Sequence, residues 1–282
     1  MIDSERTLAR IAEQLLMGPR YCGADAHAQV QTWIAERMDA ADSLHIQEFE
    51  ESFFGFPQRC KNIWARFAGD REGRIMLGTH YDTRPRADRD ANPTMRERPV
   101  PGANDGGCGP ALFIELARDL IERRERPTVD LVFFDAEDWH GIDGKTTGIG
   151  SKHFVARLPP DERPDAMFNV DMVAGRGLML DLDVRCQQHD PSYQLTLQTF
   201  QLGRALGLDA FSLRKQHPYK WITSDHTAFM EAGIPSVLLL DIDYGPWHTV
   251  HDTLEACDAR SLEQMGQFLE ALVFGWGVGP AA

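Results

Sequence analysis

The stretch Val129–Asp138, which reads VDLVFFDAED, decides the fold. Its first six residues are apolar apart from Asp130, and a short, nearly continuous apolar run is typical of a strand that a parallel sheet buries on both faces. Three acidic residues then follow within four positions. Because ligands of open α/β sheets bind outside the carboxyl ends of the strands, this stretch predicts both a central strand and a binding site at its end.

Strands and helices alternate on both sides of this stretch. Apolar runs predict further strands at Ile63–Phe67 and Arg74–Gly78, on either side of the turn Gly69–Asp70, and at Ala166–Asp171 and Ser236–Leu240. Apolar residues at helical spacing predict two helices within Ile2–Met38, separated near Gly18–Pro19 and Gly23, and single helices at Gly109–Arg124, Gly150–Leu158, Ser192–Leu206, His226–Ala232 and Ala259–Phe274.

The stretch Tyr81–Pro101 has no periodicity and is rich in Arg, Asp and Pro, so we expect a long loop there, and loops of this length are commonly functional. The chain contains no repeat, low-complexity tract or linker. We therefore predict one domain over residues 1–282, a three-layer α/β/α fold around a central mixed, mostly parallel sheet.

Charge and composition exclude some classes of function. The formal net charge of −14 disfavours nucleic acid as a partner, because an acidic protein repels phosphate backbones. Five scattered cysteines without a CxxC pair do not resemble a disulfide framework and suit a reducing compartment. The N-terminus lacks the apolar run of a signal peptide, and no stretch approaches a membrane span, so we expect a cytoplasmic protein without a membrane partner.

Histidines and acidic residues follow the predicted strands at their carboxyl ends. His80 comes directly after one strand, Glu137 and Asp138 follow the central strand, and Asp171 ends a third. His248 lies shortly after the last strand. Because the carboxyl ends of parallel strands meet at one edge of a sheet, we expect these side chains to lie close together.

A sixth candidate, Asp105, lies in the glycine-rich segment Gly102–Gly107, where the backbone can approach a ligand closely. Neighbouring carboxylates raise one another's pKa, and a divalent cation removes that cost. A mixed set of imidazole and carboxylate ligands without cysteine suits zinc in a site that keeps one position open. The set therefore predicts a zinc site.

Each of these residues also has an ordinary structural alternative. Asp105 could cap the following helix, Asp171 could form a turn, and Glu137 with Asp138 could be a solvated pair. The histidines could be hydrogen-bonded structural residues. Their joint placement at strand ends favours the metal site over these separate explanations.

The same residues, in the same order, resemble the zinc-dependent aminopeptidase/glutaminyl cyclase superfamily. The resemblance covers roughly residues 20–273 and rests on the segments His80-Tyr81-Asp82, Gly102-Ala103-Asn104-Asp105-Gly106, Phe134-Asp135-Ala136-Glu137-Asp138, Asn169-Val170-Asp171, Ser224-Asp225-His226 and Trp247-His248-Thr249. It implies a zinc-exopeptidase-like fold and an enzyme that acts on a peptide or a small substrate derived from an amino acid.

The resemblance also implies a role for each matching residue. Zinc would be bound by Asp105, Asp138 and His248, and Glu137 would be the general acid and base. In aminopeptidases with two metals, His80 and Asp171 would bind a second zinc ion. In cyclases, which usually hold one zinc ion, Asp171 belongs to the hydrogen-bond network at the reacting centre, and Asp225 is a further catalytic candidate.

Several positions favour bacterial glutaminyl cyclases within the superfamily. Tyr81-Asp82-Thr83-Arg84-Pro85, the extended segment after Asp138 and Trp247 directly before His248 are all cyclase-like. Trp247 and Trp221 are candidates for an apolar wall around the substrate side chain. Two positions depart from the cyclase pattern, namely Ser224, which replaces an acid as in aminopeptidases, and Leu238, where animal cyclases carry a histidine.

Three functions use these residues differently. A cyclase would convert an N-terminal glutamine to pyroglutamate with release of ammonia, with one zinc ion and Glu137 moving the proton. An aminopeptidase would hold two zinc ions and release free amino acids. A non-catalytic zinc-binding module would need no general base, which Glu137 argues against. Arg84, Arg86 and Arg89, in the loop after His80, could contact a substrate carboxylate or be surface charges.

Overall fold

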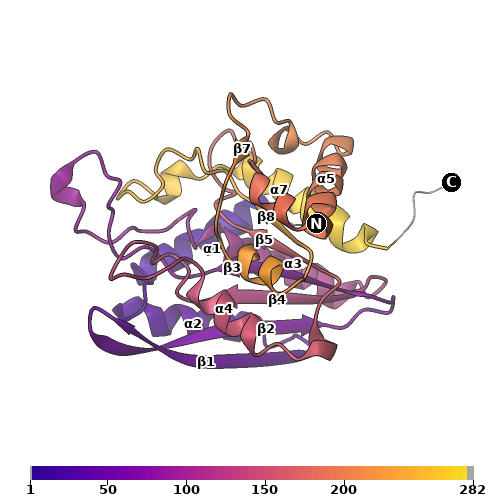
Figure 1. The fold of residues 1–282 in the computed structure, drawn as a ribbon, viewed down its shortest axis with the longest axis horizontal. Helices are drawn as coiled ribbons and strands as arrows, with labels where there is room; N and C mark the ends of the chain where they lie inside the picture. The colour runs from indigo at the N-terminus through magenta and orange to yellow at the C-terminus, as the bar shows by residue number, and fades with distance from the viewer. Residues whose placement is uncertain (1, 278–282) are drawn as a thin grey trace.

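The computed structural model describes residues 2–277, and its centre is a sheet of six strands in the order β1-β2-β4-β3-β5-β8 (Figure 1). The strands are β1 (Ser43–Phe53), β2 (Phe56–Phe67), β3 (Arg74–His80), β4 (Thr128–Phe134), β5 (Ala166–Val170) and β8 (Ser236–Leu239). The strands β3, β4, β5 and β8 are parallel, and β2 and β1 extend the sheet in antiparallel pairings. The predicted mixed, mostly parallel sheet is confirmed.

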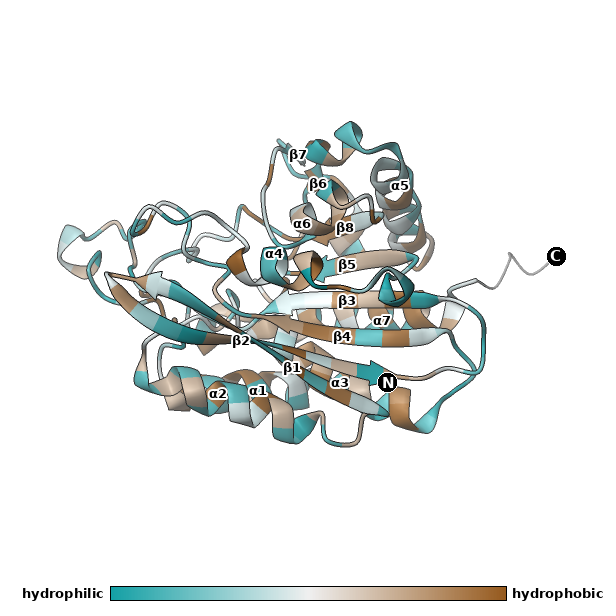
Figure 2. Ribbon diagram, turned by 60° about the horizontal axis from the view of Figure 1, so that its bottom comes forward, coloured by the Kyte–Doolittle hydropathy of each residue, from teal (hydrophilic) through white to brown (hydrophobic). Residues whose placement is uncertain are grey.

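Helices cover both faces of this sheet, as Figure 2 shows. They are α1 (Ser4–Met17), α2 (Asp25–Arg37), α3 (Cys108–Glu122), α4 (Ile149–Ala156), α5 (Asp190–Ala205), α6 (His226–Glu231) and α7 (Ala259–Gly275). Helices α1, α2, α3, α5 and α7 share one large apolar cluster with the sheet, whereas α4 and α6 pack against the opposite face in a smaller cluster. The predicted three-layer α/β/α architecture is therefore confirmed.

Strand β4 shows why the central strands are apolar on both sides. Val129, Leu131 and Phe133 point into the larger cluster, and Val132 and Phe134 point into the smaller one. Successive side chains of a strand point to opposite faces, so a strand between two helix layers needs apolar residues at both sets of positions. All five side chains are fully buried.

The antiparallel edge differs from the sequence-based expectation. Strand β1 was not predicted, because its exposed faces carry Glu and Gln residues and its apolar alternation is weak, as is common at sheet edges. A two-residue turn at Phe54-Gly55, both with positive φ, connects β1 to β2. The strands on either side of Gly69–Asp70 are both present, but β4 lies between them in the sheet.

The loop over residues 81–101 contains little regular structure, as predicted, apart from a single 3-10 turn at Pro93–Met95. Backbone hydrogen bonds from Ala87 N to Arg98 O and from Val100 N to Arg84 O join the two sides of this loop. A small two-stranded sheet, β6 (Leu182–Asp183) and β7 (Tyr219–Lys220), lies beyond β8. Among the described residues no helix is long and apolar enough to span a bilayer.

Candidate active site

Three neighbouring parallel strands end at the same edge of the sheet and deliver polar side chains there. β3 ends at His80, β4 is followed by Glu137 and Asp138, and β5 is followed by Asp171. Long loops gather beyond the arrowheads of these strands in Figure 2. Asp105 comes from the loop before α3 and His248 from the loop after β8, and all six residues are at most 8% exposed. The sequence therefore predicted correctly that these residues meet.

Asp105, Asp138 and His248 form the first half of the site. His248 Nε2 lies 3.1 Å from Asp138 Oδ1 and 3.6 Å from Asp105 Oδ2. One ligand atom from each residue lies within 4.8 Å of the other two. The Oδ2 atoms of both aspartates are buried without a hydrogen-bond partner in the described structure. Buried carboxylate oxygens without a donor are costly, so this donor set fits a divalent cation such as zinc.

His80 and Asp171 form the second half, and their polar atoms are satisfied. His80 Nε2 lies 3.2 Å from Asp171 Oδ1 and also 3.2 Å from Asp105 Oδ1. Ser224 Oγ donates to Asp171 Oδ2 at 3.2 Å and accepts from Asn169 Nδ2 at 3.0 Å. These residues therefore form a continuous hydrogen-bond network, which His80 joins to the first half through Asp105.

The pKa values of the two aspartates in the first half are shifted in opposite directions. Burial and the neighbouring Asp138 carboxylate raise the pKa of Asp105 to about 7, although His80 and His248 oppose this rise. Burial would also raise the pKa of Asp138, but His248 and Arg84 outweigh it and hold this pKa well below its usual range. Two carboxylates this close repel each other, and a cation bound between them would relieve that repulsion.

Glu137 is the carboxyl without a fixed partner. Its side chain lines the cavity, is 6% exposed and makes no hydrogen bond to the protein within residues 2–277. Burial raises its pKa well above the usual range, and the carboxylates of Asp225 and Asp171 add to that rise against the opposing charge of His80. A carboxyl group with a raised pKa can both take and return a proton near neutral pH.

Non-glycine residues with left-handed backbone cluster at this edge of the sheet. Ala136, Met172 and His248 have φ values of 55°, 48° and 57°. Each is a site residue or directly adjacent to one. Such conformations cost about 1–3 kcal/mol each and persist where the surrounding structure enforces them, which is common at active sites.

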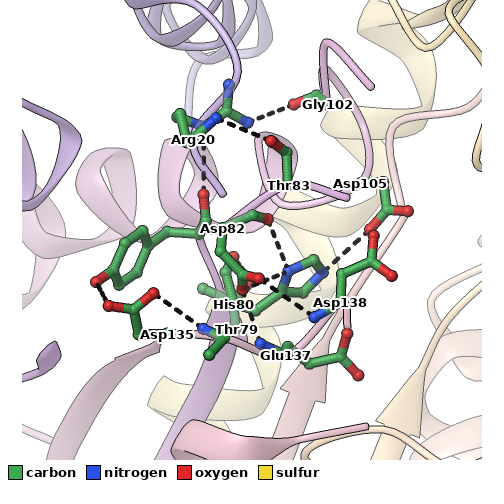
Figure 3. Close-up of polar contacts among 12 residues, drawn as sticks. Arg20, Thr79, His80, Asp82, Thr83, Gly102, Asp105, Asp135, Glu137 and Asp138 are labelled. Carbon is green, nitrogen blue, oxygen red and sulfur yellow. Dashed lines mark hydrogen bonds and ion pairs between the residues drawn. The ribbon is translucent and has the colours of Figure 1, made fainter. Parts of the chain in front are cut away.

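Two buried aspartates that the sequence analysis gave no role hold the ligand loops in place. Asp82 accepts hydrogen bonds from the backbone N of Glu137 at 2.9 Å and of Asp138 at 3.2 Å (Figure 3). Asp252 accepts from Asn104 N at 2.9 Å and Asp105 N at 3.1 Å. Asp105 does not cap α3, because the N-cap position is Gly107 and no side chain bonds to it.

Arg84 also supports the site and is not free to meet a substrate. Its guanidinium lies 2.9 Å from Asp138 Oδ1 and donates two hydrogen bonds to Asp88. The same group donates to the backbone O of His140 at 3.0 Å. Arg84 therefore joins the loop after β3 to the loop that carries Asp138, and it neutralises part of the carboxylate charge.

A cavity of about 520 Å³ opens over these residues. Glu137 and Asp171 lie in its polar floor, while Trp247, Trp221 and Leu240 contribute apolar wall. Both predicted tryptophans therefore line the cavity. Trp221 is 60% exposed and stands at the rim.

Asp225 and Leu238 lie behind the wall of the cavity. Asp225 is fully buried beside Ser151 and Gly148 and does not line the cavity, and burial raises its pKa to about 7. Its catalytic role stays a prediction. Leu238 packs with Met172 and other apolar side chains beneath the site, so no histidine stands at that place.

Two other clusters have metal-like spacing within residues 2–277, but each of their acids already accepts from a donor or pairs with a cation, and only Asp181 Oδ1 lacks a partner. In the cluster of Cys22, His27 and Asp135, the Asp135 carboxylate accepts from His27 Nε2 at 2.9 Å and from the Tyr81 hydroxyl at 2.5 Å. Three further aspartates surround an ammonium group: Lys215 Nζ lies 2.9 Å from Asp181, 2.8 Å from Asp241 and 3.4 Å from Asp243. The strand-end site therefore fits a metal best.

Known proteins similar to this chain include both kinds of enzyme. The glutaminyl-peptide cyclotransferase of Bos taurus is 22% identical over 290 residues, which cover 92% of this chain and 78% of that protein. Aminopeptidase YwaD of Bacillus subtilis is 28% identical over 209 residues, which cover 71% of this chain and 40% of that protein. The chain is thus similar both to a glutaminyl-peptide cyclotransferase and to an aminopeptidase.

Solved structures share the fold over nearly the whole chain. Tannerella forsythia glutaminyl cyclase has a TM-score of 0.86 at 25% identity and covers 97% of this chain and 99% of its own. A Zn-dependent exopeptidase from Parabacteroides distasonis has a TM-score of 0.87 at 23% identity, with 97% and 98% covered. The family model described as peptidase family M28 matches residues 62–273, which is most of the chain, and this enzyme therefore belongs to peptidase family M28.

Proposed function

We propose that this enzyme is a zinc-dependent glutaminyl-peptide cyclotransferase that converts an N-terminal glutamine to pyroglutamate and releases ammonia. The observation that carries the proposal is the difference between the two halves of the site. Asp105 and Asp138 each keep a buried oxygen without a donor, whereas Asp171 and His80 satisfy each other and Ser224. This difference favours one metal ion, as the resemblance to cyclases implies.

Asp105, Asp138 and His248 are the residues that would hold the zinc ion. Bound there, zinc supplies a Lewis acid that polarises the side-chain carbonyl of the substrate glutamine. Arg84 holds Asp138 in place through its 2.9 Å ion pair, and Asp252 holds the backbone of Asp105. A ligand set fixed by such outer contacts keeps its geometry through the reaction.

Glu137 moves the proton that the reaction requires. In cyclisation the α-nitrogen forms a bond to the side-chain carbonyl carbon, and the bond from that carbon to the amide nitrogen breaks. One proton must pass from the attacking nitrogen to the departing one. Glu137 lines the cavity with an unengaged carboxyl of raised pKa, so it can take the proton and then return it.

Asp171 orients the amine in this proposal. It lines the cavity together with Glu137, and His80 and Ser224 hold its two oxygens by hydrogen bonds. A carboxylate fixed in this way can accept a hydrogen bond from the substrate α-amine and hold it near the carbonyl carbon. Trp247, beside the ligand His248, and Leu240 confine the short glutamine side chain in an apolar part of the cavity.

An aminopeptidase is the second candidate, and one observation favours it. His80, Asp105 and Asp171 also lie within 4.8 Å of one another through ligand atoms, so they could hold a second metal ion beside the first. Ser224, the residue type common in aminopeptidases, stands behind that group. The products distinguish the two candidates, because a peptidase releases a free amino acid and no ammonia.

The test combines metal content with product analysis on one preparation. The zinc-loaded enzyme is incubated with a peptide that begins with glutamine and with a matched peptide that begins with leucine. We expect one zinc ion per chain by elemental analysis, ammonia from the glutamine peptide and no free amino acid from either. Two zinc ions with release of leucine would reject the cyclase proposal in favour of the aminopeptidase.

A further inference from the structure

Arg89 is exposed at the mouth of the cavity, next to Trp247, which directly precedes His248. Its guanidinium carbon lies 3.7 Å from the centroid of the Trp247 ring, within stacking distance. The Trp247 ring in turn lies 4.3 Å, centroid to centroid, from the His248 ring. The backbone N of Arg89 donates to His248 O at 3.2 Å. Arg89 is therefore attached to the metal-ligand loop by both its backbone and its side chain.

The positive charge of Arg89 has no counter-ion among the described residues. No carboxylate lies within 4.0 Å of its guanidinium, and the group makes no hydrogen bond within residues 2–277. Its neighbours in the same loop differ. Arg84 pairs with Asp88 and Asp138, and Arg86 pairs with Glu97. Among these three arginines, only Arg89 combines a place at the cavity with an unpaired charge.

The charge of the side chains that line the cavity therefore changes from negative at the floor to positive at the mouth. Glu137, Asp138 and Asp171 line its interior, and they attract a metal ion and an amine. Arg89 lines both the cavity and the adjoining surface hollow, which Trp247 also lines. The acidic residue of that hollow, Asp243, is paired with Lys220 at 3.0 Å and with Lys215 at 3.4 Å. A part of the substrate that extends from the reacting centre past Trp247 therefore lies near the unpaired positive charge of Arg89.

We propose that Arg89 selects substrates with a carboxylate one residue beyond the reacting glutamine. The inference rests on the proposed function, because that function places the reacting glutamine at the floor of the cavity. Two parts of a substrate could supply this carboxylate, and Arg89 would bind either of them in the same way. They are the side chain of an acidic second residue and the free C-terminus of a dipeptide.

Stacking on Trp247 makes Arg89 suitable for this role. A guanidinium on an aromatic face is attracted by the ring, and the ring limits the orientations of the side chain. The planar group still presents its edge N–H donors, which match the geometry of a carboxylate. A preorganised arginine therefore loses less conformational freedom on binding than an arginine that is free in solvent.

The test measures kcat/KM on matched pairs of peptides. Gln-Glu-amide is compared with Gln-Gln-amide, and the dipeptide acid Gln-Ala is compared with Gln-Ala-amide. Since Arg89 is exposed to solvent, we expect a preference of about 3- to 10-fold for each anionic member, mainly through KM. High salt should reduce this preference, because screening weakens exposed charge pairs. A preference in only one pair identifies the source of the carboxylate.

Three variants assign the preference to Arg89. Arg89→Met should bring the ratio of anionic to neutral substrate close to one, and Arg89→Glu should invert it towards a lysine in the second position. Arg86→Met is the matched control, because Arg86 lies in the same loop, pairs with Glu97 and does not line the cavity. The control should keep the wild-type ratio. A wild-type enzyme without preference, or a preference that survives in Arg89→Met, overturns the proposal.

The failure of this inference differs from the failure of the proposed function. Release of a free amino acid in place of ammonia rejects the cyclase, while the ratios between matched peptides still test Arg89. If no peptide is turned over, the same peptides are compared by the shift in melting temperature of the zinc-loaded enzyme. A larger shift with Gln-Glu-amide than with Gln-Gln-amide, lost in Arg89→Met, supports the carboxylate contact, and equal shifts reject it.

Discussion

The two halves of the site contain the same residue types but differ in how their oxygens are used. In the half formed by Asp105, Asp138 and His248, two buried carboxylate oxygens have no donor. In the half formed by His80 and Asp171, one carboxylate oxygen of Asp171 is hydrogen-bonded to His80 and the other accepts from Ser224. Because residue type and spacing are shared by both halves, we expect the metal ion in the half whose buried acceptors lack donors.

Removal of a ligand from the first half should have the largest effect. His248→Ala leaves Asp105 and Asp138 without their imidazole partner, so we expect loss of bound zinc and a fall in activity of at least about 10³-fold. Elemental analysis and ammonia release measure the two effects. His251→Ala is the control, because His251 is 76% exposed three residues away. Retention of zinc in His248→Ala would show that the metal lies elsewhere.

Glu137→Gln separates proton transfer from metal binding. The variant keeps the size of the side chain but cannot take a proton, so kcat should fall by about 10²- to 10⁴-fold. Zinc content should remain that of the wild type, because Glu137 belongs to neither ligand group. Activity that survives this change would exclude Glu137 as the acid and base.

Asp171→Asn tests the second half directly. Asparagine keeps one acceptor for Ser224 or His80 and removes the negative charge that faces the cavity. We expect activity to fall by about 10- to 100-fold, the usual cost of losing a partner of a metal site, with zinc content unchanged. If zinc content instead falls from two ions to one, the second half is a metal site and the two halves are equivalent.

Ser224→Ala should have the smallest effect of the series. It removes one hydrogen bond to Asp171 and leaves Asn169 without its acceptor, so we expect a loss of about 2- to 10-fold in kcat/KM. Ser52→Ala, on the exposed edge strand β1, should change nothing. An unchanged rate in Ser224→Ala would mean that His80 alone fixes Asp171.

The sequence predicted the buried part of the fold well and its edge poorly. Strand β4 was clear because helix layers on both faces require apolar residues at nearly every position, and Asp130 is the one exception within Val129–Phe134. Strand β1 has one solvated face and charged residues, so its pattern resembles that of a loop. The separation of β2 from β3 by β4 could not be predicted, because strand order depends on tertiary packing.

The site was predictable where residues act through side chains that meet at strand ends. His80 ends β3, Asp138 lies shortly after β4 and Asp171 directly follows β5, and the sheet geometry brings such residues together. The sequence analysis predicted no role for Asp82 and Asp252, because both accept hydrogen bonds from backbone N–H groups that are far away in the chain. No spacing rule exists for such contacts. The only signal was for Asp82, which is an acid inside the motif His80-Tyr81-Asp82, whereas Asp252 lies outside the quoted motifs.

Arg20 closes the loop over residues 81–101 at its base. Its buried guanidinium donates to the backbone O of Tyr81 and of Pro101, both at 3.2 Å. It also donates to the backbone O of Gly102 at 2.6 Å (Figure 3). The two ends of the loop are thus fixed together, while its outer part around Pro93 is exposed. Insertions there would lengthen the loop without moving His80 or Asp105. Evolution can therefore vary what the rim recognises while the chemistry beneath it is inherited unchanged.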